Sequence, residues 1–147
     1  MSRQGIALLV AVVVLAALGV ISATGLALGQ AERLAGTLAV AEVQARGAAE
    51  AAIAEALRGW PPIRTPMLPG QEVLLAELFL PGPASGRATL RALGARVYSI
   101  NGRGERIDGS GRTVATVRAE LLVTLDSVGP DSTVRPRAYP RGWRLLP

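Results

Sequence analysis

The chain has 147 residues, half of them hydrophobic, and its formal net charge is +5. It contains no cysteine and no histidine, which excludes disulfides, thiolate metal sites, cysteine nucleophiles and the commonest general base. The whole positive excess falls in residues 59–147, which hold twelve arginines and seven acidic residues; such a charge either attracts a polyanion or keeps a domain soluble.

An uncharged run of 23 residues extends from Ile6 to Leu28. As an α-helix it would be about 34 Å long, enough to cross a hydrocarbon core of roughly 30 Å. Arg3 is the only charge that precedes it, and the positive-inside tendency then favours a cytoplasmic N-terminus. The sequence therefore predicts a single-pass membrane segment with the remainder of the chain outside the cytoplasm.

The helical pattern continues beyond this run, because residues 30–58 contain no proline and are rich in alanine. Glycine at Gly59 followed by two prolines at 61 and 62 predicts the end of the helix. Small and apolar residues recur at three- and four-residue steps and should form one face that a domain covers. This face comprises Leu34, Leu38, Ala41, Ala45, Ala48 or Ala49, Ala52 or Ile53, and Ala56 or Leu57.

Strand patterns follow a proline-rich stretch, and Asn101-Gly102 and Asp108 to Gly111 have the composition of tight hairpin turns. Residues 112–126 give the clearest strand: apolar residues such as Leu121 alternate with polar ones such as Glu120, which predicts one face on a core and one in solvent. Strands are predicted over residues 72–80 (favoured there over a short helix), 87–93, 95–100, 103–107 and 112–126, and residues 128–147 are predicted as a tail or an edge strand.

Gln4-Gly5 directly precedes IALLVAVVVLAALGVISATGLAL, and AERLAG and ARGAAEAAIAEAL extend the same helix. These segments resemble the class III signal and helix of type IV pilins and type II secretion pseudopilins, in particular PilX-type minor pilins and K-type minor pseudopilins; DGSGRTVATVRAELLV is similar to a turn and strand near the end of many such proteins. The resemblance implies cleavage after Gly5 by a prepilin peptidase and methylation of Ile6.

The resemblance also implies an α+β, pilin-like fold, with a long N-terminal helix packed on a small antiparallel sheet. It implies an inner-membrane protein that later joins a periplasmic or cell-surface filament with other pilin or pseudopilin subunits as partners. The predicted parts are a leader (1–5), a transmembrane and filament-spine helix (6–58), a linker (59–71) and a globular antiparallel β domain with an Arg/Pro-rich tail (72–147).

Two residues depart from the family pattern. The usual first mature residue is phenylalanine, and here it is Ile6. Major pilins carry glutamate at the fifth mature position, where it neutralises the terminal amine of a neighbouring subunit; here that position is Val10. Because a buried unpaired ammonium is costly, this chain cannot provide that partner. The departure resembles K-type pseudopilins and favours a minor, tip-proximal subunit.

Two alternatives to a purely structural minor pilin remain open. The chain could be a signal-anchored envelope protein without a filament role, or a minor pilin that binds DNA or a surface through its basic tail. Arginines can contact phosphates and aromatic rings can stack on bases, although the same tail could dock as an edge strand. The tail residues are Arg135, Arg137, Tyr139, Arg141, Trp143 and Arg144.

No catalytic, metal or cofactor site is predicted. The acidic residues have no recognisable metal-binding or glycosidase spacing. Asp108-Gly109-Ser110-Gly111 lacks the spaced carboxylates of an EF-hand and the lysine of a P-loop. The sequence thus favours a structural protein over an enzyme.

Overall fold

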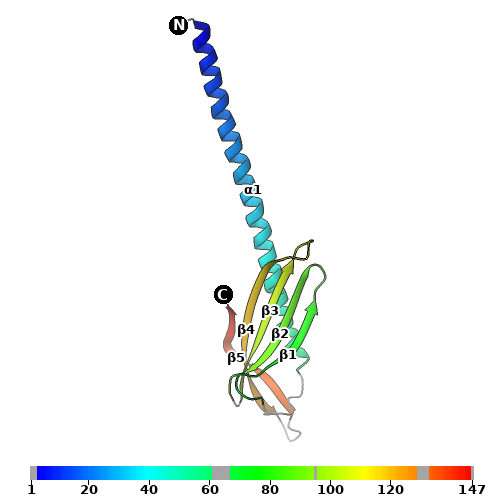
Figure 1. Cartoon of the computed structure of the whole chain (residues 1–147). Helices are drawn as coiled ribbons and strands as arrows, with labels where there is room; N and C mark the ends of the chain where they lie inside the picture. The colour runs from blue at the N-terminus through cyan, green and yellow to red at the C-terminus, as the bar shows by residue number, and fades with distance from the viewer. Residues whose placement is uncertain (1–2, 61–66, 95, 129–132, 147) are drawn as a thin grey trace. The chain divides into compact units, whose positions relative to one another are not determined.

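The computed structural model describes residues 3–60, 67–94, 96–128 and 133–146, without the side chains of residues 3–9, 126–128 and 133–135. One helix and five strands lie in these ranges (Figure 1): α1 (Arg3–Arg58), β1 (Glu72–Phe79), β2 (Ala84–Ala92), β3 (Val97–Ile107), β4 (Thr113–Val128) and β5 (Thr133–Leu146). The strands form one antiparallel sheet in the order β1-β2-β3-β4-β5. The predicted α+β class is confirmed.

The chain divides into two compact units, Met1–Thr37 and Leu38–Pro147, and α1 runs through both. In the second unit, the last five turns of α1 pack on the sheet. The helix ends at Arg58, as Gly59 predicted, and Gly59 N donates a hydrogen bond to Glu55 O at 2.8 Å.

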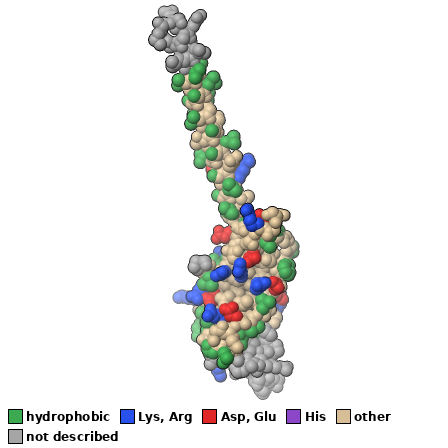
Figure 2. Space-filling model, viewed as in Figure 1, with side chains coloured by type: hydrophobic (Ala, Val, Ile, Leu, Met, Phe, Trp, Pro, Cys, Tyr) green, Lys and Arg blue, Asp and Glu red, His purple; other side chains and the backbone are tan. Residues whose placement is uncertain are grey.

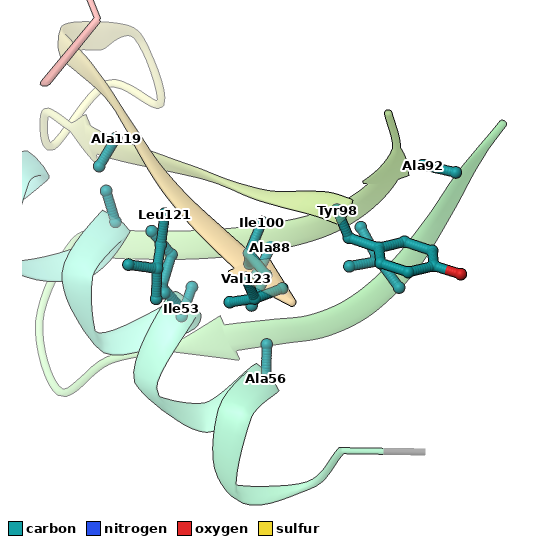
Figure 3. Close-up of a cluster of buried hydrophobic side chains, with 12 residues drawn as sticks. Ile53, Ala56, Ala88, Ala92, Tyr98, Ile100, Ala119, Leu121 and Val123 are labelled. Atoms are coloured by element: carbon teal, nitrogen blue, oxygen red, sulfur yellow. The ribbon is translucent and has the colours of Figure 1, made fainter. Parts of the chain in front are cut away.

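The core of the second unit combines alanines and Ile53 of the helix with larger apolar side chains and three alanines of the sheet (Figure 3). On α1 the buried positions step by three and four residues, which places them on one face. The sheet contributes Leu90, Ile100, Leu121 and Val123, each at most 7% exposed. The buried residues of α1 are Ala41, Ala45, Ala48, Ala49, Ala52, Ile53 and Ala56.

Glycines on β2 and β3 let the helix backbone approach the sheet directly. A Cβ atom built on Gly104 would lie 1.8 Å from Ala45 O, and one on Gly86 would lie 2.2 Å from Ala48 O. No side chain fits at either position. Arg106 adds a polar contact to this interface, because its Nε donates to Gln44 Oε1 of α1 at 2.6 Å.

The predicted turn at Asn101-Gly102 is wrong, because β3 runs without interruption from Val97 to Ile107. Asn101 pairs with Thr89 of β2 and Glu120 of β4. A Cβ atom on Gly102 would lie 2.7 Å from an α1 backbone oxygen. The glycine is therefore needed for close contact with the helix and not for a turn, so the two strands predicted over residues 95–107 are one.

The predicted turn after β3 is confirmed. Gly111 N donates to Asp108 O at 3.0 Å, and Gly111 has a φ of 84°. Ser110 Oγ donates to Asp108 Oδ1 at 2.6 Å, and Arg112 N donates to the same oxygen at 2.9 Å. These hydrogen bonds, the one from Ser110 first, lower the pKa of the Asp108 carboxyl because they favour its charged form.

The other predicted strands, over residues 72–80, 87–93 and 112–126, correspond to β1, β2 and β4. The tail forms β5, so the edge-strand interpretation of residues 128–147 is confirmed for the described part, 133–146.

We expect Gly104→Ala to destabilise the second unit by about 3 kcal/mol or more, since the added methyl must push a helix backbone away and overpacking alone costs about 1–3 kcal/mol. Gly109→Ala is the control, because nothing lies within 4 Å of its Cβ position. Urea unfolding of the full chain in non-ionic detergent, followed by tryptophan fluorescence, measures both. Equal midpoints for the two variants would contradict the close helix–sheet contact.

Candidate functional site

The N-terminal part of α1 presents apolar side chains around its whole circumference. Consecutive residues Val12, Val13, Val14 and Leu15 are each more than half exposed. A helix that is apolar all round requires lipid or protein on every side. By length and composition α1 can cross a membrane: its most apolar 18-residue window has a mean hydropathy of 2.4.

The predicted processing residues lie on this helix. Gly5 and Ile6 are within α1, although the side chain of Ile6 lies outside the described part. Ile6 and Val10 are four residues apart and thus share one helical face. Val10 is 54% exposed. Residues 6 and 10 thus lie about one turn apart along α1.

The uncovered apolar surface extends well beyond the 23-residue run. Leu34 and Leu38 were predicted on the domain-covered face, but they are 64% and 54% exposed, and burial along that face starts only at Ala41. Val40 and Val43 are also more than half exposed. The prediction is wrong for the two leucines because they precede the first buried position of α1, which is Ala41.

The tail residues do not gather on one face of β5. Trp143 pairs with the core residue Leu121, whereas Arg144 pairs with Glu120 on the opposite face, since successive strand residues point to opposite sides. Arg137 pairs with Thr124, and Arg141 has a left-handed φ of 62°.

The two aromatic residues of the tail, Tyr139 and Trp143, are 49% and 39% exposed. The side chain of Arg135 lies outside the described residues. Among the described side chains, Trp143 and Arg144 thus lie on opposite faces of β5, whereas Arg137 and Tyr139 line one shallow pocket beside Thr124.

Glu120 was predicted on the solvated face of β4, and this expectation is wrong. Its side chain is only 9% exposed, because Arg144 reaches across from β5 and contacts Glu120 Oε2 through both Nε and Nη2. The Arg144 side chain is itself 63% exposed. Arg144 is thus engaged in an ion pair that joins the last two strands, and it is a poor candidate for a phosphate contact.

Acidic side chains form no metal-binding group in the described residues: nowhere do three of His, Cys, Asp and Glu converge. Comparison with protein-family models, curated proteins and solved structures found no match for this chain.

A double-mutant cycle tests the role of the Glu120–Arg144 pair. We expect Glu120→Gln and Arg144→Gln to show a coupling energy of about 1–2 kcal/mol, between the values for exposed and buried ion pairs. Arg46 and Glu50, at 52% and 41% exposure, provide the control pair, with an expected coupling of about 0.3–0.5 kcal/mol. Urea unfolding measures both cycles, and equal couplings would mean that Arg144 is effectively solvated.

Proposed function

We propose that this chain is a minor subunit of a type IV pilus or a type II secretion pseudopilus. The N-terminal part of α1 would anchor it in the inner membrane first and would then pack among the helices of other subunits. The prepilin peptidase and the neighbouring subunits would be its protein partners.

The observation that carries this proposal is the length of the uncovered apolar helix. Large apolar side chains are exposed from Val10 to Val43, a stretch of about 51 Å at ~1.5 Å per residue. A hydrocarbon core of roughly 30 Å covers about 20 residues. Glu32 and Arg33, both exposed, favour a membrane boundary before residue 32, which leaves Leu34, Leu38, Val40 and Val43 in water.

This distribution favours a filament subunit over a protein that is only membrane-anchored. A simple anchor gains nothing from leucine and valine beyond the lipid, whereas extended exposed apolar surfaces indicate partner contacts. In a bundle of subunits, the helices of neighbours would cover these residues. The alanine face of α1 stays committed to its own sheet, so the leucine and valine positions are the ones available for assembly.

Processing is proposed at Gly5-Ile6, since this bond immediately precedes the uncharged run. Cleavage there keeps the whole apolar helix on the mature chain, which a filament subunit needs. Val10 lacks the carboxylate that would neutralise a neighbour's methylated amine, so the subunit fits best where no neighbour requires it, at or near a filament tip.

The mature chain should begin at N-methylated Ile6. N-terminal mass spectrometry of the membrane fraction from cells with an active prepilin peptidase checks this. Gly5→Val should abolish cleavage while the protein stays in the membrane, and Ser2→Ala should be processed normally. An intact residue 1–5 segment on the unsubstituted protein would refute the processing step.

Filament composition tests the tip assignment. Quantitative mass spectrometry of purified filaments should find this chain far below one copy per major subunit. Val10→Glu should raise the share of this chain in filaments, because the new carboxylate would let the subunit enter the shaft, where a neighbouring amine requires one. Val12→Glu is the matched control. Position 12 is two residues further along the helix and on another face, so its carboxylate has no amine to neutralise it and incorporation should fall. Equal incorporation of both variants would remove the basis for the role given to position 10.

A further inference from the structure

Three arginines form a row across the face of the sheet opposite α1. Arg87 of β2 pairs with Arg103 of β3, and Arg103 pairs with Arg118 of β4. Each is exposed, and the buried residues next to them in sequence face the helix. With strands about 4.8 Å apart, the three Cα atoms span roughly 10 Å. Like charges placed directly opposite one another destabilise a sheet, so folding alone does not account for this row.

The row borders a shallow cavity of about 360 Å³, to which Arg91 of β2 adds a fourth guanidinium. We call this cavity the arginine pocket. Thr89 and Asn101 contribute neutral hydrogen-bonding groups, and Glu72 is the only carboxylate among its lining residues. Figure 2 shows arginine and acidic side chains together over the body of the sheet. No lining residue of the pocket is aromatic.

Three of the four arginines are held by carboxylates. Arg87 Nη2 lies 2.9 Å from Glu77 Oε1, Arg103 Nη2 lies 2.6 Å from Glu105 Oε1, and Arg91 Nε lies 3.8 Å from a Glu72 oxygen. The hydrogen bond and charge of Glu77 raise the pKa of Arg87. Glu77 and Glu105 do not line the pocket, so they orient their arginines from outside it.

Arg118 differs from the other three arginines. Within the part of the chain that the structure describes, no carboxylate pairs with it. Among these described residues its guanidinium also makes no hydrogen bond, and it lines the same pocket as Arg103. An incoming anion would meet one unpaired arginine flanked by others that are already positioned.

We propose that the arginine pocket binds a phosphate group, with Arg118 and Arg103 as its main contacts. Guanidinium groups donate paired hydrogen bonds to phosphate oxygens, and a phosphate has enough oxygens for two arginines at once. The absence of aromatic residues from the lining favours recognition of the phosphate without stacking on a base. The phosphate could belong to a nucleic-acid backbone or to a small phosphorylated molecule. The tail contributes only Leu146 to the lining of this pocket, and the site does not depend on the proposed filament role.

The test uses the full chain in non-ionic detergent, titrated calorimetrically with sodium tripolyphosphate and, separately, with a single-stranded DNA 10-mer. Saturable binding of tripolyphosphate is expected. Arg118→Gln should weaken it about tenfold, as expected for loss of charge-assisted hydrogen bonds. Arg118→Lys should recover only part of the affinity, because lysine keeps the charge but loses the planar fork. Arg112→Gln is the control: it removes the same charge from an arginine that is 80% exposed and outside the pocket.

The two ligands distinguish the sources of the phosphate. Tighter binding of the oligonucleotide, with a salt slope that falls by about 0.7 in Arg118→Gln, would support a nucleic-acid backbone. Tighter binding of tripolyphosphate would support a small phosphorylated ligand. The proposal would be overturned by equal losses of affinity for Arg118→Gln and Arg112→Gln, or by undiminished binding to Arg118→Gln at an unchanged urea midpoint. It would also be overturned if citrate bound as tightly as tripolyphosphate, or if no saturable binding occurred.

Discussion

The contact between the alanine face of α1 and the glycines of β2 and β3 is the constraint on which the second unit depends. Ala45 and Ala48 present backbone oxygens to positions where any Cβ atom would overlap them. Each buried methyl contributes only about 0.8 kcal/mol, so this interface derives its stability from close packing over many small groups. Larger residues such as Leu90 and Ile100 on the sheet fill the space around it.

Side-chain size also varies along the helix. Alanine dominates where α1 meets its own sheet, and leucine and valine dominate where the described structure leaves it uncovered. Val43 lies within two residues of Ala41 and Ala45 but remains exposed, because it points away from the covered face. Large apolar side chains that the sheet leaves exposed therefore recur along α1 from Val10 to Val43, and membrane thickness sets an upper limit to how many of them lipid can cover.

The opposite face of the sheet has a different chemistry. Arginines and glutamates pair there, mostly between neighbouring strands, and at Glu120 the carboxylate is covered by the Arg144 side chain that neutralises it. Such pairs satisfy nearly every arginine in the centre of the face, and Arg118 is the exception among the described residues. The net charge of +5 does not by itself define a binding site. Strand pairing does, because it places Arg118, which has no carboxylate partner among the described residues, opposite the paired Arg103.

The sequence by itself determined the long helix, its end at Gly59, the α+β class, most strands and the turn at Asp108, because these depend on apolar periodicity and on local glycine and proline effects. It misassigned Gly102, since a glycine required by a helix on the far side of a sheet looks the same as a glycine required by a turn. It also placed Leu34 and Leu38 on the covered face and Glu120 in solvent. Only the tertiary structure decided these positions, and likewise the row of Arg87, Arg103 and Arg118, because they depend on which residues become neighbours across strands that are distant in sequence.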